Sequence, residues 1–344
     1  MSFSDLIKST PRGLYCEAGD FYVDPWRPVK RAVITHGHSD HARWGCRQYL
    51  AADTNRHILP ARLGSSAKIE FAPLRKPQRI GPVNIQFVPA GHILGSAQVV
   101  IEHRGEIAVV SGDYKRQTDP TCLPFEPVRC HTFVTESTFG LPIYHWPDSK
   151  TVFADVNAWW RQNQRQGKAS VLLAYALGKA QRLLAGIDAT IGPIYTHGSV
   201  EKLNQAYRNS GASLPETTYA SNLDRGTDFG SSLIIAPPST LGTPWIRRFG
   251  KISTGMASGW MTIRGTRRRR GMDRGFVLSD HVDWPSLLRT IQETEAENIW
   301  VTHGYSDVVV RHLRDQGLNA TALVTEFTGE LLEGEATANE EVTT

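Results

Sequence analysis

Six residues near the start of the chain include four side chains that could bind metal ions. The stretch AVITHGHSDHARWG, residues 32–45, contains His36, His38, Asp40 and His41 directly after an apolar run. In an extended segment, side chains two residues apart point to the same face, so His36 and His38 can share one ion. Two histidines do not complete a coordination shell, so further ligands must come from elsewhere in the chain. Asp40 and His41 follow a serine turn and can reach a second ion.

The elements that must position these residues change in type along the chain. The first third contains the runs KRAVITH, NIQFVPAGH and AQVVIEHRGEIAVVSGDY, which predict strands and a hairpin that turns at Arg104-Gly105. TVFADVNAWWRQNQRQG then predicts a helix and SVLLAYA a buried strand, which is typical of a small α/β unit. Ligand candidates occur on both sides of this middle third. The sequence therefore predicts one domain that is interrupted near residue 150 and resumes near residue 275.

Composition limits the class of protein. A chain of 344 residues with 40% hydrophobic residues can bury a proper core. The sequence has no apolar stretch of about 18 residues, and MSFSDLIKST does not resemble an export signal. Its four cysteines form no CxxC pair. We therefore expect a soluble cytoplasmic protein that does not contact a membrane. The net charge is only +4, but six arginines lie between residues 264 and 274. Such a run is either a solvated loop or a contact for phosphate groups.

The pattern HxHxDH after a hydrophobic strand resembles the metallo-β-lactamase superfamily. That family requires a later histidine and then an aspartate at the end of a strand, which GHILGS and VVSGDY supply as His92 and Asp113. The resemblance implies an α/β protein with a four-layer αββα fold and a two-metal hydrolytic site at its rim. One metal would be held by His36, His38 and His92, and the other by Asp40 and His41, with Asp113 as the bridge. Asp24 in FYVDPW matches an early aspartate of the family that supports the metal-binding histidines.

Motifs in the second half are similar to those of the β-CASP nucleases within this superfamily. VTESTFG resembles the first of their three signature motifs, and LLAYALGKAQRLL resembles the segment that opens their inserted cap. LSDHVDW and WVTHGYSD supply His281 and His303 as the second and third motifs. The resemblance implies that His303 completes the second metal's ligands and that His281, oriented by Glu136, contacts the scissile phosphate as a general acid. It covers roughly residues 15–330 and is closest to the bacterial ligase-associated DNA exonucleases.

The resemblance also implies a domain organisation. Residues 1–150 and 275–332 would form the metallo-β-lactamase catalytic domain, and residues 151–274 would form the inserted α/β β-CASP cap. Residues 333–344 are small, polar and acidic, so we expect a disordered tail.

The function implied is that of a two-metal DNA exonuclease that acts from 5′ to 3′, in repair beside a DNA ligase. Asp40, His281 and Glu136 would be its catalytic residues. Histidine ligands favour zinc, and manganese is the alternative. The substrate would be single-stranded or end-containing DNA. Its negatively charged phosphate backbone would need cations of the protein. Candidates for contacts with that backbone are Lys115, Arg116, Arg267, Arg268, Arg269 and Arg270. Candidates for base stacking are Trp44, Phe139, Tyr144, Trp146 and Trp260.

Three other functions are compatible with parts of the pattern. An RNA-processing nuclease would use the same metal site, because that site does not read the 2′-hydroxyl group. A small-molecule metallo-hydrolase would leave Glu136 and His281 without a role. A non-catalytic binding protein would be expected to lack ligands, and none of the expected ligands is missing here.

Overall fold

The structure is a computed structural model that describes residues 6–224, 226–263, 265, 271–323 and 325–326. The chain is mixed α/β and divides into two compact units. The first unit comprises Met1–His145 and His281–Glu330, and the second comprises Trp146–Asp280 and Leu331–Thr344. Residues 267–270 and the expected tail at 333–344 lie outside the described residues. No described helix has the length and apolar character needed to cross a bilayer.

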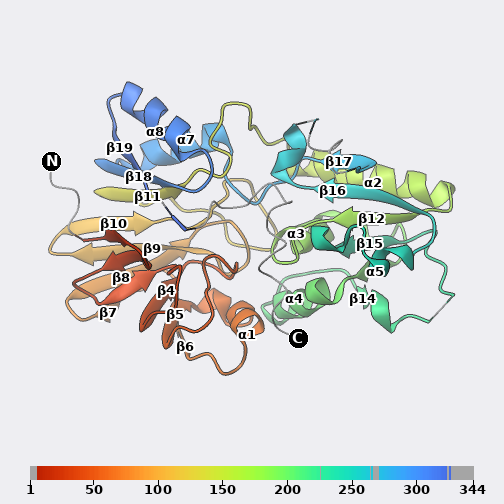
Figure 1. The fold of residues 1–344 in the computed structure, drawn as a ribbon, viewed down its shortest axis with the longest axis horizontal. Coiled ribbons are helices and arrows are strands. Elements are labelled where there is room, and N and C mark those ends of the chain that lie inside the picture. The colour runs from red at the N-terminus through yellow and green to blue at the C-terminus, as the bar shows by residue number, and fades with distance from the viewer. Residues whose placement is uncertain (1–5, 225, 264, 266–270, 324, 327–344) are drawn as a thin grey trace. The chain divides into compact units, whose positions relative to one another are not determined.

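The described part of the first unit contains two sheets, three α-helices and a short 3₁₀ helix. Figure 1 shows their arrangement. The six-stranded sheet has, in spatial order, β1 (Lys8–Thr10), β2 (Gly13–Cys16), β3 (Phe21–Val23), β4 (Arg31–Ile34), β5 (Gln48–Ala52) and β6 (Ile69–Ala72). The seven-stranded sheet has, in spatial order, β19 (Asn319–Ala322), β18 (Asn298–Thr302), β11 (Thr132–Glu136), β10 (Glu106–Val110), β9 (Ala97–His103), β8 (Val83–Pro89) and β7 (Gln78–Ile80). The helices are η1 (Asp53–Asn55), α1 (Ile58–Leu63), α7 (Trp284–Thr294) and α8 (Ser306–Asp315).

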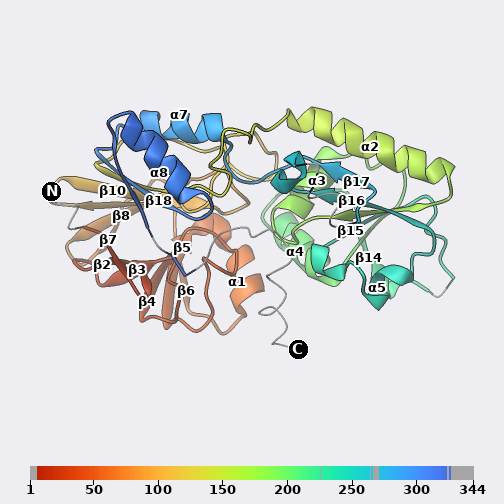
Figure 2. The same cartoon turned by 45° about the horizontal axis from the view of Figure 1, so that its top comes forward.

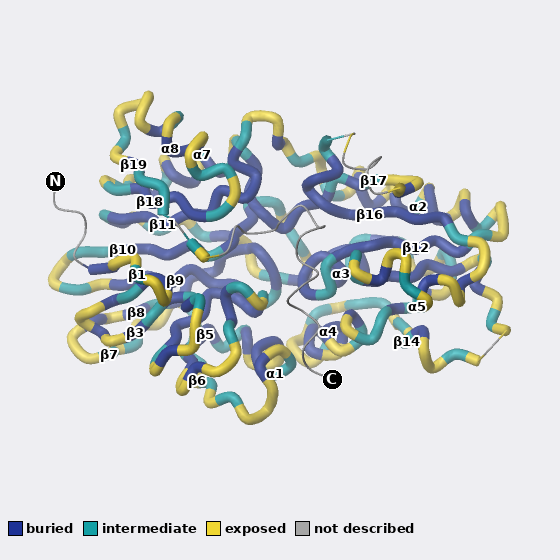
Figure 3. The backbone as a smooth tube through the Cα atoms, in the orientation of Figure 1, coloured by how far each residue is buried: buried dark blue, intermediate teal, exposed yellow. Residues whose placement is uncertain are grey.

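Alternation along the strands separates the buried side chains of this unit into distinct cores. One core joins the two sheets, with Phe21 and Val33 from the first and Phe87 and Val99 from the second. The opposite face of the seven-stranded sheet packs against α7 and α8, and the opposite face of the six-stranded sheet packs against α1. Because side chains alternate between faces, strands such as β4, β8, β9 and β10 contribute to two cores at once. Figure 3 shows that β11 and β18 are largely buried, whereas β7 at the edge of its sheet is not.

Strand direction brings distant motifs to one edge of the seven-stranded sheet. β10, β11 and β18 pair in parallel, and β8 runs the same way as β10 because both are antiparallel to β9. The carboxyl ends of these four strands therefore meet at one edge. The six-stranded sheet reaches the same place after β4, where the backbone amide of Ala97 donates to the carbonyl of Thr35 at 2.9 Å. The expected hairpin is present between β9 and β10, with positive φ at Arg104 (52°) and Gly105 (84°).

The second unit is built on a single sheet whose strand pairs are all parallel. Its spatial order is β14 (Thr218–Tyr219), β13 (Ile194–Thr196), β15 (Leu233–Ala236), β12 (Ala169–Leu173), β16 (Ile252–Ala257) and β17 (Arg274–Phe276). Its α-helices are α2 (Ser149–Arg165), α3 (Lys179–Gly186), α4 (Gly198–Asn209) and α5 (Pro244–Arg247), which Figure 2 shows from a second angle. Its described residues also form the 3₁₀ helices η2 (Ala220–Asn222), η3 (Pro238–Thr240) and η4 (Gly259–Thr262). Asp148 caps α2 by accepting a hydrogen bond from the amide of Lys150.

Candidate metal centre

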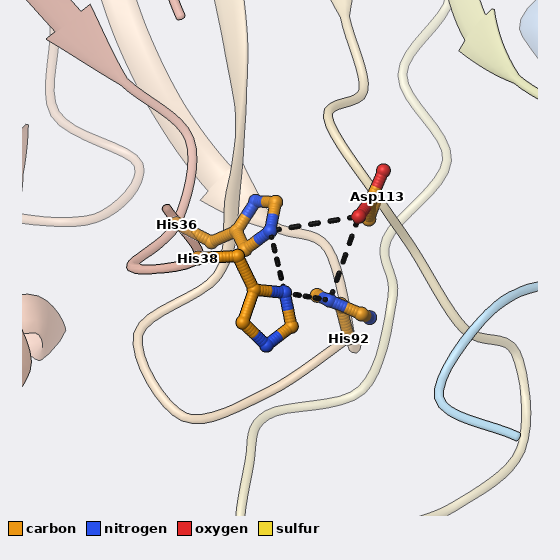
Figure 4. Close-up of side chains that lie close together, drawn as sticks. All are labelled: His36, His38, His92 and Asp113. Carbon is orange, nitrogen blue, oxygen red and sulfur yellow. Dashed lines mark hydrogen bonds and ion pairs between the residues drawn. The ribbon is translucent and has the colours of Figure 1, made fainter. Parts of the chain in front are cut away.

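Three histidines and an aspartate converge at the carboxyl edge of the seven-stranded sheet (Figure 4). Nδ1 of His38 lies 3.1 Å from Nε2 of His36 and 3.0 Å from Nε2 of His92. Oδ2 of Asp113 lies 3.6 Å from Nε2 of His36 and 3.7 Å from Nε2 of His92. Ligands about 2.0–2.1 Å from a tetrahedral zinc ion are roughly 3.3 Å apart, so these four atoms have the spacing of one metal site.

A second group of ligand atoms uses the other side of Asp113. His41, Asp113 and His303 could hold a further ion, with Nε2 of His41 3.5 Å from Oδ2 of Asp113 and Nδ1 of His303 3.8 Å from Oδ1. Nε2 of His41, Oδ1 of Asp113 and Nδ1 of His303 are all buried and make no hydrogen bond. Buried polar atoms are normally satisfied, so three such atoms facing one another fit a cation bound between them. The residues present therefore fit two metal ions that share Asp113.

Asp24 and Thr35 orient two of the imidazole rings. Oδ2 of Asp24 accepts from Nδ1 of His41 at 2.7 Å, and the same carboxylate accepts from the amide (2.8 Å) and the hydroxyl (2.5 Å) of Thr35. The hydroxyl of Thr35 in turn lies 3.0 Å from Nδ1 of His36. With Nδ1 of His36 and His41 carrying the hydrogen, Nε2 of each ring presents its lone pair to the centre. Thr35 lies within the THG that opens the motif, but its hydroxyl is no typical metal ligand, so its residue type alone did not mark this role.

Three residues at the centre, Asp24, Gly112 and His303, have positive φ angles. Asp24 and His303 both adopt positive φ, 43° and 57°, which is costly for residues other than glycine. At Gly112, with φ 58°, a Cβ atom would lie only 2.5 Å from the hydroxyl of Thr35. A side chain at Gly112 would therefore displace the threonine that orients His36. Ser137 holds the other end of the centre, because its hydroxyl donates to the carbonyl of His303 at 2.5 Å.

A buried histidine–glutamate pair lies beside the ligands. Nδ1 of His281 lies 2.8 and 3.0 Å from the two carboxylate oxygens of Glu136, and 3.9 Å from Oδ2 of Asp113. Glu136 is itself fixed, because its Oε1 accepts from the backbone amide of Tyr114 at 2.8 Å. The carboxylate fixes the ring through Nδ1, so proton transfer by this ring would use Nε2. This is the arrangement of an oriented general acid or base.

Buried carboxylate and imidazole groups at the centre shift one another's pKa values. Burial lowers the pKa of His36, and neighbouring histidines lower it further, to well below its usual value. Burial also lowers the pKa of His41, but Asp113, Asp40 and Asp24 outweigh it and hold this pKa well above the usual value. Burial raises the pKa of Asp113, but His41 and His281 outweigh it, so the net shift is downward. The centre keeps Asp113 ionised and concentrates negative charge at His41, where a cation is favoured.

Asp40 is placed less centrally than the histidines. Its Oδ2 lies 3.6 Å from Nε2 of His41, and its side chain is 29% exposed. Among the described residues, four groups have metal-binding geometry: the two above, Asp24 with His36 and His41, and Asp113 with Glu136 and His281. Asp40 belongs to none of them. It lies at the rim of the second group, where it lines a small cavity together with Asp24, His41 and His303.

Two of the side chains expected to contact substrate phosphate, Lys115 and Arg116, form ion pairs within the protein. Lys115 is buried, and its ammonium group pairs with Asp119 at 2.6 Å. The guanidinium group of Arg116 pairs with Glu293, also at 2.6 Å. Both side chains thus pair with carboxylates of the protein, and their contact with substrate phosphate stays a prediction. Arg267, Arg268, Arg269 and Arg270 lie outside the described residues.

The five aromatic side chains proposed for base stacking differ in their exposure to solvent. Phe139, Tyr144 and Trp260 are buried, which corrects their assignment to base stacking, and Trp146 is half-buried. Trp44, three residues after His41, is 76% exposed. Of the five candidates, Trp44 presents its ring most fully to solvent.

Comparison with known proteins finds relatives that are nucleic-acid enzymes by name. The chain is 29% identical over 313 residues to a protein of Opitutus terrae named "Probable DNA ligase", covering 90% of this chain and 30% of that one. It is 29% identical over 134 residues to an "RNase J-like protein" of Methanocaldococcus jannaschii, covering 36% of this chain and 32% of that one. It is 28% identical over 206 residues to "Cleavage and polyadenylation specificity factor 73" of Drosophila melanogaster, covering 55% and 30%. The chain thus spans about a third of the length of these relatives.

Two further comparisons concern the fold and the family models. A solved protein of unknown function from Enterococcus faecalis shares the fold with a TM-score of 0.58 and 10% identity, covering 86% of this chain and 79% of that one. No family model matches the chain.

Proposed function

We propose that this chain, whose homologues include β-CASP nucleases of the metallo-β-lactamase superfamily, is a two-metal DNA exonuclease that hydrolyses phosphodiester bonds. One observation carries the proposal: two groups of ligand atoms share Asp113, and the His281–Glu136 pair lies directly beside them. A hydrolytic site of this kind needs charge stabilisation and proton transfer at one place. Both are present at this edge of the sheet.

The residues would divide the work as follows. His36, His38, His92 and Asp113 would hold one ion, and His41, Asp113 and His303 the other, with Asp40 at the rim. When bound, two divalent ions supply Lewis-acid stabilisation of the phosphate and lower the pKa of an attacking water. Histidine-rich ligands favour zinc, and the shared carboxylate also suits manganese. His281 would protonate the leaving oxygen through Nε2, while Glu136 holds the ring by Nδ1.

DNA is proposed as the substrate because of how the relatives align. The match to the protein named as a probable DNA ligase extends over 90% of this chain, whereas the alignments with the RNase J-like protein and with cleavage and polyadenylation specificity factor 73 cover 36% and 55%. We infer action on single-stranded or end-containing DNA from 5′ to 3′, in cytoplasmic repair beside a ligase. The second candidate is an RNA-processing nuclease, which is supported by relatives named "Endoribonuclease YSH1".

Two structural assignments belong to the same proposal. The packing of helix, sheet, sheet and helix in the first unit supports the four-layer αββα arrangement. The parallel α/β sheet of the second unit, which lies between the two segments of the first unit along the chain, supports a β-CASP cap.

Digestion of matched single strands tests the substrate and the polarity together. DNA and RNA of one sequence, labelled at either end, are incubated with the protein and Zn²⁺ or Mn²⁺. The proposal expects metal-dependent release of mononucleotides or short products from the 5′ end of DNA. A tenfold preference for RNA would overturn the DNA assignment in favour of the second candidate. Metal-independent cleavage, or no cleavage of either polymer, would overturn the two-metal nuclease.

Trp44→Ala is expected to weaken binding of single-stranded DNA about tenfold. Stacking of a base on an aromatic side chain contributes about 1–3 kcal/mol, and about 1.4 kcal/mol corresponds to a factor of ten in Kd. Trp44 is exposed and follows the metal-binding loop directly, so we expect a rise in Kd and KM with a smaller change in kcat. Fluorescence anisotropy with labelled DNA measures the effect. Leu123→Ala removes another exposed apolar side chain and should leave Kd unchanged; equal Kd values for the two variants would exclude stacking by Trp44.

Replacing Arg267 to Arg270 with glutamine is expected to flatten the salt dependence of DNA binding. Each phosphate contact to a single strand contributes about 0.7 to the slope of log K against log salt concentration, so four lost contacts lower the slope by about 3. Affinity is measured between low and physiological salt. Arg129→Gln, at a side chain 78% exposed in the first unit, is the control for loss of surface charge. An unchanged slope in the fourfold variant would make the run a solvated loop.

A further inference from the structure

Lys115 holds the backbone that carries a metal ligand. Its ammonium group is fully buried, and it donates to the carbonyl oxygen of His92 at 3.0 Å as well as pairing with Asp119 at 2.6 Å. A lysine is rarely buried unless its charge is compensated, so this placement has a specific cause. Two of its partners are local: a buried carboxylate and the main chain of His92.

Asp119 is anchored in turn. Its second oxygen, Oδ1, accepts from the amide of Thr121 at 2.8 Å and from its hydroxyl at 2.7 Å. The loop after Asp119 therefore fixes the carboxylate, the carboxylate fixes the ammonium group, and the ammonium group fixes the carbonyl of His92. The thiol of Cys122 adds a contact to the neighbouring carbonyl of Gly91 at 3.4 Å.

The backbone around His92 packs closely against the backbone of Lys115. Gly91 has φ 74°, and a Cβ atom there would lie 2.4 Å from the carbonyl oxygen of Lys115. The amide of Lys115 also donates to the carbonyl of Ala90 at 3.2 Å. On the other side, the hydroxyl of Ser96 accepts from the amide of His92 at 3.0 Å. The backbone of His92 is thus held through both its amide and its carbonyl.

Three consecutive residues serve three parts of the centre. Asp113 is the shared ligand, the amide of Tyr114 fixes Glu136, and the ammonium group of Lys115 fixes His92. These residues begin three positions after the end of β10, so one short segment sets the relative positions of two ligands and of the glutamate that orients His281.

We propose that the Lys115–Asp119 pair is a positioning device that keeps His92 in metal-binding geometry, and not a contact for substrate phosphate. The inference rests on the proposed metal occupancy of the centre. The pair is internally neutral, so it gives little net charge to the substrate. Groups that orient a ligand typically change metal affinity about 10- to 100-fold when they are lost.

Metal titration of four variants tests this inference. Lys115→Met leaves Asp119 buried without its partner and is expected to lower the melting temperature as well as metal affinity. The double variant Lys115→Met/Asp119→Asn removes both charges and keeps the Oδ1 acceptor for Thr121. It is expected to recover the melting temperature of the metal-free protein but to bind one of two metal ions about 10- to 100-fold more weakly, because His92 still lacks its donor. Lys115→Arg should retain part of the affinity, and Lys8→Met breaks an exposed ion pair as the control.

The readout is competition with a chromogenic chelator for Zn²⁺, without nucleic acid. Two binding events of unchanged affinity in a folded double variant would overturn the positioning role. Equal loss of affinity in Lys8→Met would also overturn it. If the unaltered protein binds no metal, the proposed function itself fails, so the two failures are distinguishable.

Discussion

His41→Ala is expected to remove one of two bound metal ions and to reduce phosphodiester cleavage about 10³-fold or more. His41 supplies a buried Nε2 atom that makes no hydrogen bond and faces Asp113, and its other ring nitrogen is held by Asp24. Without the imidazole, the second group retains only Asp113 and His303, with Asp40 at the rim. A metal ion contributes several kcal/mol to transition-state stabilisation, and about 1.4 kcal/mol is a factor of ten in rate. Metal analysis of the purified protein measures the stoichiometry, and digestion of labelled DNA measures the rate.

Asp40→Ala tests whether Asp40 helps to bind the second ion, and a histidine variant outside the centre is the control. Asp40 lies at the rim, so Asp40→Ala is expected to abolish cleavage with the fold retained, through weaker binding of the same ion. His57→Ala removes an exposed histidine at the start of α1 and should keep both ions. Circular dichroism establishes that each variant is folded. Normal turnover by either Asp40→Ala or His41→Ala would refute the two-metal proposal.

His281→Ala is expected to lower kcat about 10²- to 10⁴-fold while both metal ions remain bound. His281 is buried against Glu136 and lies beside Asp113, so its loss removes proton transfer without removing a proposed ligand. The rate is measured with single-stranded DNA, and metal content is determined in parallel. Glu136→Gln should show a smaller loss of kcat, because glutamine keeps a hydrogen bond to Nδ1 but not the charge that stabilises the imidazolium ion.

A substrate with a better leaving group separates general acid catalysis from positioning. The p-nitrophenyl ester of thymidine 5′-monophosphate releases p-nitrophenolate, which needs no proton. The loss in His281→Ala should therefore shrink by at least tenfold with this ester. An equal loss with DNA and with the ester would assign His281 to phosphate binding. A loss of bound metal would make it a ligand instead.

Local pattern made much of the centre predictable from the sequence. The HGHSDH run is six consecutive residues, so these residues are neighbours in any fold, and their spacing carries information about metal ligands. The hairpin at Arg104-Gly105 and the helix that ends before Gly167 likewise depend on nearby residues. Homologues that include β-CASP nucleases confirm the resemblance inferred from these motifs and from the later ones.

Other features depended on contacts that sequence spacing does not describe. Lys115 follows Asp113 by two residues, which suggested a cation facing the same substrate. The chain turns after β10 so that the ammonium group points inward to Asp119 and His92. Phe139 and Tyr144 similarly resemble stacking residues but are buried. Side-chain direction in an irregular segment depends on what packs around it, so neighbouring residue types alone did not predict it.

The sequence by itself determined which residues have metal-binding chemistry, because imidazole and carboxylate groups at short spacing retain that chemistry in any fold. Only the tertiary structure decided how they combine. The shared direction of β8, β10, β11 and β18 brings His92, Asp113, Glu136 and His303 to one edge, although about 210 residues separate the first from the last. The same structure assigned Thr35, Ser137 and the Lys115–Asp119 pair to supporting roles. Hydrogen bonds between segments far apart in the chain depend on strand order, which the spacing of residues does not specify.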